Sequence, residues 1–329
     1  MPPYQILYYR ALLTLSHLSF QYPDGSEPLQ DVGFSLPSGT IMALVGPSGS
    51  GKTTLLKIIA GLLPPTAGEP FWKNTSIAPF AHELIPGHPD IQLVHQDYQL
   101  PGHQRLLDSF RWPLRYWEET DRDQEIAKLV QLLTLQGLEQ RKPRELSGGQ
   151  QQRAALALGL LEAPELLLLD EPFSHVDAPR KAALRSEIRR RVQKDGLTVV
   201  FTTHEPEDAL ALADEVGILQ GGKLAQTGTP EEVYHRPVDE TTARLLGPYN
   251  QLSPGSLHHK GMGFRPSTVI LSHSGNYEAE VVDCTFFGVY TLVRLALPTG
   301  QSILAQHATP IASGSKVRFS LNDTGVVWG

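Results

Sequence analysis

The sequence predicts an α/β domain with a mostly parallel sheet, followed by a small all-β domain. Four short apolar runs, bounded by turn or charged residues, have the composition of parallel strands covered on both faces; they are residues 40–46, 91–96, 165–172 and 197–204. Helical stretches alternate with them, as in proteins whose sheet is parallel. After Tyr234 comes a stretch rich in proline, glycine and polar residues, and beyond it the pattern alternates with period two and is rich in β-branched and aromatic residues, which indicates β-strands at 277–306 and 315–329.

Four stretches have helical patterns, at residues 51–63, 123–138, 149–163 and 177–196. The last has the clearest end signals, because Asp177 is a suitable N-cap, Pro179 is close to position N1, and Gly196 ends the stretch. We therefore expect a helix that begins after Asp177 and ends before Gly196.

Changes in composition predict the domain boundaries. Residues 1–12 are expected to be an N-terminal extension, residues 13–236 the α/β domain, and residues 263–329 the β domain, in the form of a barrel. Residues 237–262 are rich in proline, glycine and polar residues, which predicts a linker with one short helix. At 329 residues the chain is long enough for a large and a small domain.

Composition argues against several classes of protein. The net charge of −7 argues against nucleic acid as a partner. Cys284 is the only cysteine, which excludes an intrachain disulfide and a cysteine-based zinc site and fits a reducing compartment. Arg10 interrupts the apolar start of the chain, so a signal peptide is not expected. The longest apolar stretch, 154–169, is broken by two glutamates and a proline, so we expect no membrane-spanning helix.

The segment GPSGSGKT follows an apolar strand and opens a helix, which is the setting of a phosphate-binding loop. Its glycines let successive backbone N–H groups point at an anion, and the helix N-terminus adds partial positive charge. We expect Lys52 to reach the β- and γ-phosphates and the Thr53 hydroxyl to bind Mg²⁺. The nucleotide-binding residues predicted here are Gly46, Pro47, Ser48, Gly49, Ser50, Gly51, Lys52, Thr53 and Thr54.

Two acidic residues end the leucine-rich strand in LLLLDEP. Acids at the carboxyl edge of a parallel sheet can face a ligand. Asp170 suits the role of holding magnesium, and Glu171 that of a general base that polarises the attacking water.

A second segment, LSGGQQQR, also has the features of an anion-binding helix start. Ser147 is a suitable N-cap, Gly148 and Gly149 leave free backbone N–H groups, and a helix follows. Alone this would be an ordinary helix start. Beside a complete phosphate-binding loop it is a second anion site that the first does not need.

The order and spacing of GPSGSGKT, LSGGQQQR and LLLLDEP resemble those of the nucleotide-binding subunit of an ATP-binding cassette (ABC) transporter, a P-loop NTPase. The resemblance covers about residues 13–234. It implies an ABC cassette fold with a helical subdomain at about 97–160, and ATP and Mg²⁺ as cofactors. It also implies a head-to-tail dimer, of one chain or with a close paralogue, in which Ser147, Gly148, Gly149 and Gln150 complete the ATP site of the opposite subunit.

Four further residues take family roles by this resemblance. Tyr22 would stack on adenine, and His204 would hydrogen-bond the γ-phosphate. Gln96 would touch Mg²⁺ and the attacking water, and Asp177 would lie in the loop that crosses the dimer interface. The implied catalytic residues are Glu171, His204, Gln96 and Lys52, and the implied metal ligands are Thr53, Gln96 and Asp170.

The sequence departs from the family pattern in two places. His175 and Val176 stand where the family usually has a small residue and a leucine, so the dimer seam should pack differently there. In the segment 97–116, which should meet the membrane subunits, Pro101, Gly102 and His103 only partly reproduce the family's Phe-Pro-His pattern.

The segment GFRPSTVILS and the β-rich tail resemble the small TOBE barrel that follows the cassette in importers of oxyanions, polyamines, ferric iron and sugars. The resemblance therefore implies an importer, with ferric iron or a polyamine as the expected cargo. Its partners would be separate membrane permease subunits and, indirectly, an extracytoplasmic solute-binding protein; the chain would lie in the cytoplasm on the inner face of the membrane. The alternatives are the ATPase of an ABC exporter and a non-transport ABC ATPase.

Overall fold

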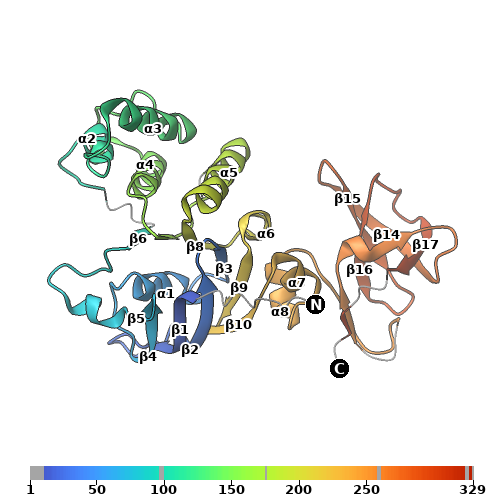
Figure 1. The fold of residues 1–329 in the computed structure, drawn as a ribbon. Coiled ribbons are helices and arrows are strands. Elements are labelled where there is room, and N and C mark those ends of the chain that lie inside the picture. Colours follow the sequence, from blue (N-terminus) through green and yellow to red (C-terminus); the bar gives the residue numbers. More distant parts are fainter. Residues whose placement is uncertain (1–10, 96–99, 175, 258–260, 323–325, 328–329) are drawn as a thin grey trace, which may run out of the picture. The chain divides into compact units, whose positions relative to one another are not determined.

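The computed structural model describes residues 11–95, 100–174, 176–257, 261–322 and 326–327 (Figure 1). The chain forms two compact units, Met1–Pro230 and Glu231–Gly329. The domain boundaries expected at 236 and 262 remain predictions, and α8 (Glu240–Leu245) and β11 (Asn250–Leu252) fall within the stretch assigned to the linker.

A six-stranded sheet with the strand order β10-β9-β3-β8-β7-β6 organises the first unit. All neighbours in it are parallel except β10, which pairs antiparallel with β9 at the edge. The predicted α/β class and the four predicted parallel strands are confirmed. The strands are β3 (Ile41–Val45), β6 (Ile91–Val94), β7 (Leu166–Leu169), β8 (Thr198–Thr203), β9 (Glu215–Gln220) and β10 (Lys223–Gly228).

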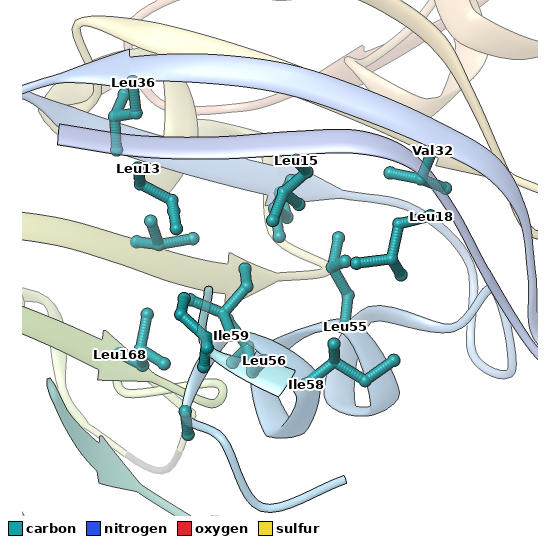
Figure 2. Close-up of a cluster of buried hydrophobic side chains, with 14 of the residues drawn as sticks. Leu13, Leu15, Leu18, Val32, Leu36, Leu55, Leu56, Ile58, Ile59 and Leu168 are labelled. Carbon is teal, nitrogen blue, oxygen red and sulfur yellow. The ribbon is translucent and has the colours of Figure 1, made fainter. Parts of the chain in front are cut away.

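The first unit also holds an antiparallel sheet, which the sequence analysis did not predict, with the order β2-β1-β4-β5. Its strands are β1 (Ala11–Phe20), β2 (Leu29–Pro37), β4 (Ala67–Trp72) and β5 (Thr75–Ser76). Leu13, Leu15 and Leu18 of β1 are buried in one cluster with side chains of α1 and of the central strands (Figure 2). The pairing of β1 with β2 has a register irregularity between Leu15 and Leu18. This core fixes α1, and with it the segment that precedes the helix.

Six α-helices complete the described part of the first unit: α1 (Lys52–Ile59), α2 (Leu106–Arg111), α3 (Glu119–Leu132), α4 (Gly148–Leu161), α5 (Ala178–Asp195) and α6 (Pro206–Leu212). The ends predicted for α5 are confirmed, because Asp177 caps it and Gly196 ends it at φ +71°. Three helices end before the predicted residue: α1 before Gly61 at φ +72°, α3 before Thr134 at φ +53°, and α4 before Ala163 at φ +45°. Backbone in the left-handed region cannot continue an α-helix.

Ion pairs join α3 to α5, and a hydrogen bond from the same cluster of side chains reaches α4. Glu187 of α5 accepts hydrogen bonds from Lys128 of α3 at 2.9 Å and from Arg190 and Arg191 of its own helix. Arg191 in turn donates to the Leu160 carbonyl of α4 at 2.9 Å and pairs with Glu125 of α3. These five charged side chains, the Glu187 cluster, hold α3, α4 and α5 together.

The second unit carries two antiparallel sheets, with the orders β13-β17-β14-β15-β16 and β11-β12-β18, in agreement with the predicted small β domain. It also contains α8 and most of α7 (Pro230–His235). The remaining strands of this unit are β12 (Met262–Phe264), β13 (Val269–Leu271), β14 (Tyr277–Phe286), β15 (Thr291–Ala296), β16 (Ser302–His307), β17 (Lys316–Leu321) and β18 (Val326–Val327), with a short 3-10 turn at Pro266–Thr268. Two further 3-10 turns, at Ala78–His82 and Pro143–Glu145, belong to the first unit.

Arg265 connects α7 and α8 to the β-sheets of this unit through hydrogen bonds. Its side chain is 2% exposed and donates to the carbonyl oxygens of Tyr234 and Ala243, at 3.1 and 2.8 Å, and also to those of Gly247 and Pro248. The guanidinium also lies 4.1 Å from the centre of the Tyr234 ring. Throughout both units, none of the described helices has the length and apolar character that crossing a bilayer requires.

Candidate functional site

A cavity of about 750 Å³ lies where the chain leaves β3, β7 and β8. Carboxyl ends of parallel strands are the usual place for a ligand in such a sheet. Most of the residues that line it were predicted from the sequence. The lining consists of Tyr22, Ser26, Glu27, Pro28, Ser48, Gly49, Gly51, Lys52, Thr53, Thr54, Glu171 and His204.

The loop between β3 and α1 needs glycine at two places where the chain approaches itself closely. Gly51 has φ +100°, and a Cβ there would lie 2.2 Å from the Pro28 carbonyl oxygen. A Cβ on Gly46 would lie 2.2 Å from the Leu219 carbonyl oxygen. The loop is thus curled so that α1 begins at the cavity, with the partial positive charge of its N-terminus directed there.

Lys52 is held under this loop. Its ammonium donates to the carbonyl oxygens of Gly46 at 2.8 Å and Pro47 at 3.0 Å, and the side chain is 7% exposed. Burial lowers the pKa of Lys52, an effect that the negative charges of Glu171 and Asp170 oppose. The result is a fixed cation at the base of the cavity. Nearby, the buried Ser50 hydroxyl has no hydrogen-bond partner among the described residues.

Asp170 and Glu171 are held by hydroxyl groups from two directions. Asp170, 5% exposed, accepts from Thr53 at 2.8 Å and from Thr202 at 2.6 Å. The same Thr202 hydroxyl accepts from the Glu171 backbone N–H at 3.0 Å. Thr202 therefore fixes both acids, although the sequence analysis did not select it. The strand register was the missing signal, because Leu169 pairs with Phe201 and so places the next two residues side by side.

Glu171 and His204 lie together at the cavity. The His204 Nδ1 is 3.3 Å from a Glu171 carboxylate oxygen. Glu171 has φ +50°, in the left-handed region that non-glycine residues seldom adopt. Such a conformation persists where the surrounding structure enforces it, and it is often found at functional sites.

Tyr22 lies at the mouth of the same cavity. Its hydroxyl is 3.0 Å from the Thr54 hydroxyl, and its ring meets Phe20 edge to face with the centroids 4.8 Å apart. An aromatic face is thereby held at the cavity beside the phosphate-binding loop. Stacking on adenine remains a prediction.

The segment LSGGQQQR does not line this cavity. Ser147 caps α4 as predicted, with its hydroxyl accepting from the Gln150 N–H at 3.4 Å and the Gln150 side chain accepting from the Ser147 N–H at 2.9 Å. Cβ atoms built on Gly148 or Gly149 would meet no backbone within 4 Å. Asp177, predicted for the interface loop, is bound by Arg180 of its own helix.

Two residues from the sequence analysis, Gln96 and His175, lie outside the described residues. Their predicted roles stay predictions. The structure thus brings together the phosphate-binding loop, Asp170, Glu171, His204 and Tyr22, and leaves Ser147, Gly148, Gly149, Gln150 and Asp177 outside the cavity of their own chain.

Comparison with known proteins agrees with the fold. Family models match at residues 29–174, described as ABC transporter, and at 262–328, described as TOBE domain. The sn-glycerol-3-phosphate import ATP-binding protein UgpC of Chromohalobacter salexigens is 37% identical over 326 residues, which cover 91% of this chain and 85% of the relative.

Two solved structures of the ATP-binding cassette MJ0796 are also similar. The dimeric post-hydrolysis state bound to ADP and Pi has 26% identity and a TM-score of 0.59, and it covers 66% of this chain and 98% of its own. A second dimeric structure of this bacterial ABC transporter cassette has 25% identity and a TM-score of 0.58, with the same coverage. The chain belongs to the ABC transporter family, as an ATP-binding cassette ATPase followed by a TOBE domain.

Proposed function

We propose that this protein is the ATP-hydrolysing subunit of an ABC importer, and that two copies, or one copy and a close paralogue, close head to tail around two ATP molecules. The observation that carries the proposal is the pairing of a complete phosphate-binding cavity with a second, outward-facing anion site at the start of α4. In the proposed dimer, the cavity of one chain and the start of α4 of the other chain together form one ATP site.

Within the cavity, Tyr22 stacks on the adenine, and residues Gly46 to Thr54 wrap the phosphates. Lys52 contacts the β- and γ-phosphates, because it is the buried cation at the base of the loop. His204 contacts the γ-phosphate, and Glu171 accepts a proton from the water that attacks the γ-phosphorus as ADP leaves. The 3.3 Å contact between His204 and Glu171 allows both to reach the same phosphate.

The residues present fit a magnesium ion that arrives with the nucleotide. The Thr53 hydroxyl and an Asp170 carboxylate oxygen, 2.8 Å apart, are hard oxygen donors at the edge of the cavity. Mg²⁺ is commonly held by one or two carboxylates together with substrate phosphates. Thr53, Asp170 and Gln96 are the proposed ligands, and the ion when bound neutralises charge that develops on the phosphates.

The dimer is supported by the glycines of LSGGQQQR. Neither Gly148 nor Gly149 is among the residues with positive φ, and no backbone approaches a Cβ at either one. Glycine is less favourable than alanine in a helix, by about 1 kcal/mol in the interior, and no contact among the described residues requires glycine at these two positions. In the dimer, Ser147, Gly148, Gly149 and Gln150 would bind a phosphate of the ATP held by the other subunit. The close approach of that phosphate explains why glycine occupies positions 148 and 149. The solved relatives include dimeric cassettes.

Import is supported by the TOBE match and by the relative, whose name states import of sn-glycerol-3-phosphate. That name favours a phosphorylated small solute as cargo, and the ferric iron or polyamine expected from the sequence finds no support in it. The described residues contain no candidate membrane span, so the proposed permease subunits are separate chains on whose cytoplasmic side this subunit sits, and an extracytoplasmic binding protein delivers the solute.

The surface after β6 offers a contact for those permeases. Trp112, Tyr116 and Trp117 are 67%, 86% and 50% exposed, and Arg115 packs over the first two rings. Exposed aromatic and arginine side chains are typical of binding surfaces. Trp112, Arg115 and Tyr116 lie in the segment 97–116 that was expected to meet the membrane subunits, and Trp117 directly follows it.

The experiment that tests the proposal is Glu171→Gln. The variant should bind ATP, lose most hydrolysis, and form a dimer in ATP and Mg²⁺ that gel filtration separates from the monomer. Ser147→Arg in the same background is the matched control and should remain monomeric while still binding ATP. If Glu171→Gln stays monomeric at high protein concentration with ATP and magnesium, the proposed ATP-dependent dimer is wrong.

A further inference from the structure

A buried glutamine that has no role in the proposed ATP site connects α4 to the general base. Gln152 lies in the second turn of α4, and its side chain is 4% exposed. Its Nε2 donates to the Glu171 carbonyl oxygen and to the Ser174 hydroxyl, both at 3.0 Å. Ser174 donates to the same Glu171 carbonyl at 2.8 Å. Three residues thus form a closed set of hydrogen bonds around one carbonyl group.

That carbonyl belongs to a residue whose backbone is strained. Glu171 has φ +50°, in the left-handed region that residues with a side chain seldom adopt. Two contacts hold this backbone conformation. On one side of the Glu171 Cα the N–H donates to the Thr202 hydroxyl, and on the other side the carbonyl accepts from Gln152 and Ser174. Releasing the carbonyl would let the backbone relax and would turn the Glu171 carboxylate away from the cavity.

The two ends of this connection serve different ATP molecules under the proposed function. Ser147, at the start of α4, binds the ATP held by the partner copy, whereas Glu171 acts on the ATP held by its own chain. Gln152 stands between them on the same helix, only five residues from Ser147. A rigid first turn and a half of helix therefore joins one ATP site to the base of the other.

We propose that Gln152 is a positioning residue that couples the two ATP sites of the dimer: binding of the partner's ATP at the start of α4 sets the orientation of Glu171 in the same chain. The inference rests on the proposed function. The coupling depends on the two hydrogen bonds that the Gln152 side chain donates, and it needs no ligand other than ATP.

Gln152→Met tests this, since methionine keeps the size and loses both donated bonds. The turnover number should fall about tenfold or more, because small misplacements of a catalytic group are costly, while the dissociation constant for ATP stays within about twofold. The Hill coefficient for ATP hydrolysis should fall toward one. Ser174→Ala, which removes one of the two donors to the same carbonyl, should change the same quantities in the same direction but less.

Gln151→Met is the matched control. The Gln151 side chain also donates two hydrogen bonds from α4, to the carbonyls of Pro143 and Leu146, at 3.0 and 3.2 Å, but none to Glu171. Its loss should lower stability about as much as the loss of Gln152 does. It should leave the turnover number and the Hill coefficient for ATP hydrolysis unchanged, because Gln151 does not act through Glu171.

The deciding measurement repeats Gln152→Met in the Glu171→Gln background. If Gln152 acts through Glu171, the second substitution should change residual single-turnover hydrolysis by less than about twofold and should leave the ATP-dependent dimer intact. Equal losses in both backgrounds, or a normal turnover number and Hill coefficient for Gln152→Met, would overturn the inference. Failure of Glu171→Gln to form a dimer would instead overturn the proposed function, so the two failures are distinguishable.

Discussion

Glu187→Gln should destabilise the first unit by removing the one negative charge shared by three cations. Glu187 is 7% exposed and accepts from Lys128, Arg190 and Arg191 at 2.8 to 3.0 Å. Burial alone would raise the pKa of its carboxyl group, but the hydrogen bonds of Arg190 and Lys128 and the charges of Lys128 and Arg191 lower this pKa from 4.5 to about 2. The folded protein therefore favours the charged form strongly.

The size of the effect follows from that pKa. Each tenfold change in an acid constant is worth about 1.4 kcal/mol, so the lowering from 4.5 to about 2 corresponds to about 3 kcal/mol. Lys128 is 43% exposed and Arg190 33%, so water weakens part of the interaction. We expect Glu187→Gln to reduce the free energy of unfolding by about 1.5 to 3 kcal/mol at neutral pH.

The pH dependence has a definite sign. The folded pKa lies below the unfolded value, so the stabilisation is complete above about pH 4.5 and is lost as the pH falls toward about 2. Urea denaturation followed by far-UV circular dichroism should show a constant difference between wild type and variant from pH 7 to about 5.5, and a smaller one at about pH 3.5.

Glu119→Gln is the control, because Glu119 lies in the same helical region and is 81% exposed beside Arg122. Its loss should cost about 0.5 kcal/mol or less. Equal effects of the two substitutions, or a difference for Glu187 that grows in acid, would refute the reasoning.

Three further predictions concern other parts of the chain. Lys52→Met should fill the same buried space without the charge, and isothermal titration should show at least a tenfold loss of ATP affinity with no loss of thermal stability, because burial already disfavours the ammonium. Arg265→Lys cannot reach all its carbonyl partners, so calorimetry should show the second unit destabilised by about 2 to 4 kcal/mol while hydrolysis by the first unit persists. Gly148→Ala should leave the monomer as stable or slightly more stable, yet lower ATP-dependent dimer formation in the Glu171→Gln background; an unchanged dimer would count against the outward-facing site.

The sequence predicted those parts of the fold in which the local pattern and the final structure agree. The four parallel strands, the cap at Asp177 and the capping role of Ser147 depend on a few adjacent residues, and all were confirmed. The antiparallel sheet that contains β1, β2 and β4 was missed. β1 and β2 are neighbours in the chain, but β4 is separated from them by β3 and α1, so its pairing with β1 depends on contacts distant in sequence.

The candidate site shows the same division. Lys52, Thr53, Asp170, Glu171 and His204 lie in motifs with their own local signals, and the structure gathers them at one cavity or its edge. The supporting residues Thr202, Gln152, Ser174 and Pro28 carry no such signal, because each is defined by a neighbour on another element. Strand register would have revealed Thr202. The contact between α4 and the end of β7 can be found only in three dimensions.

The Glu187 cluster and Gln152 together determine how a displacement of the N-terminus of α4, at Ser147, is transmitted to the rest of the first unit. Arg191 holds the Leu160 carbonyl in the last turn of α4, and the Glu187 cluster ties Arg191 to α3, while Gln152 ties the second turn to Glu171. A helix fixed at its C-terminal end cannot slide to absorb a push at its start, so the movement must appear at the next attachment, which is Glu171. It follows that Glu187→Gln, which contacts neither nucleotide, should lower the Hill coefficient for ATP hydrolysis, and that Glu119→Gln should not.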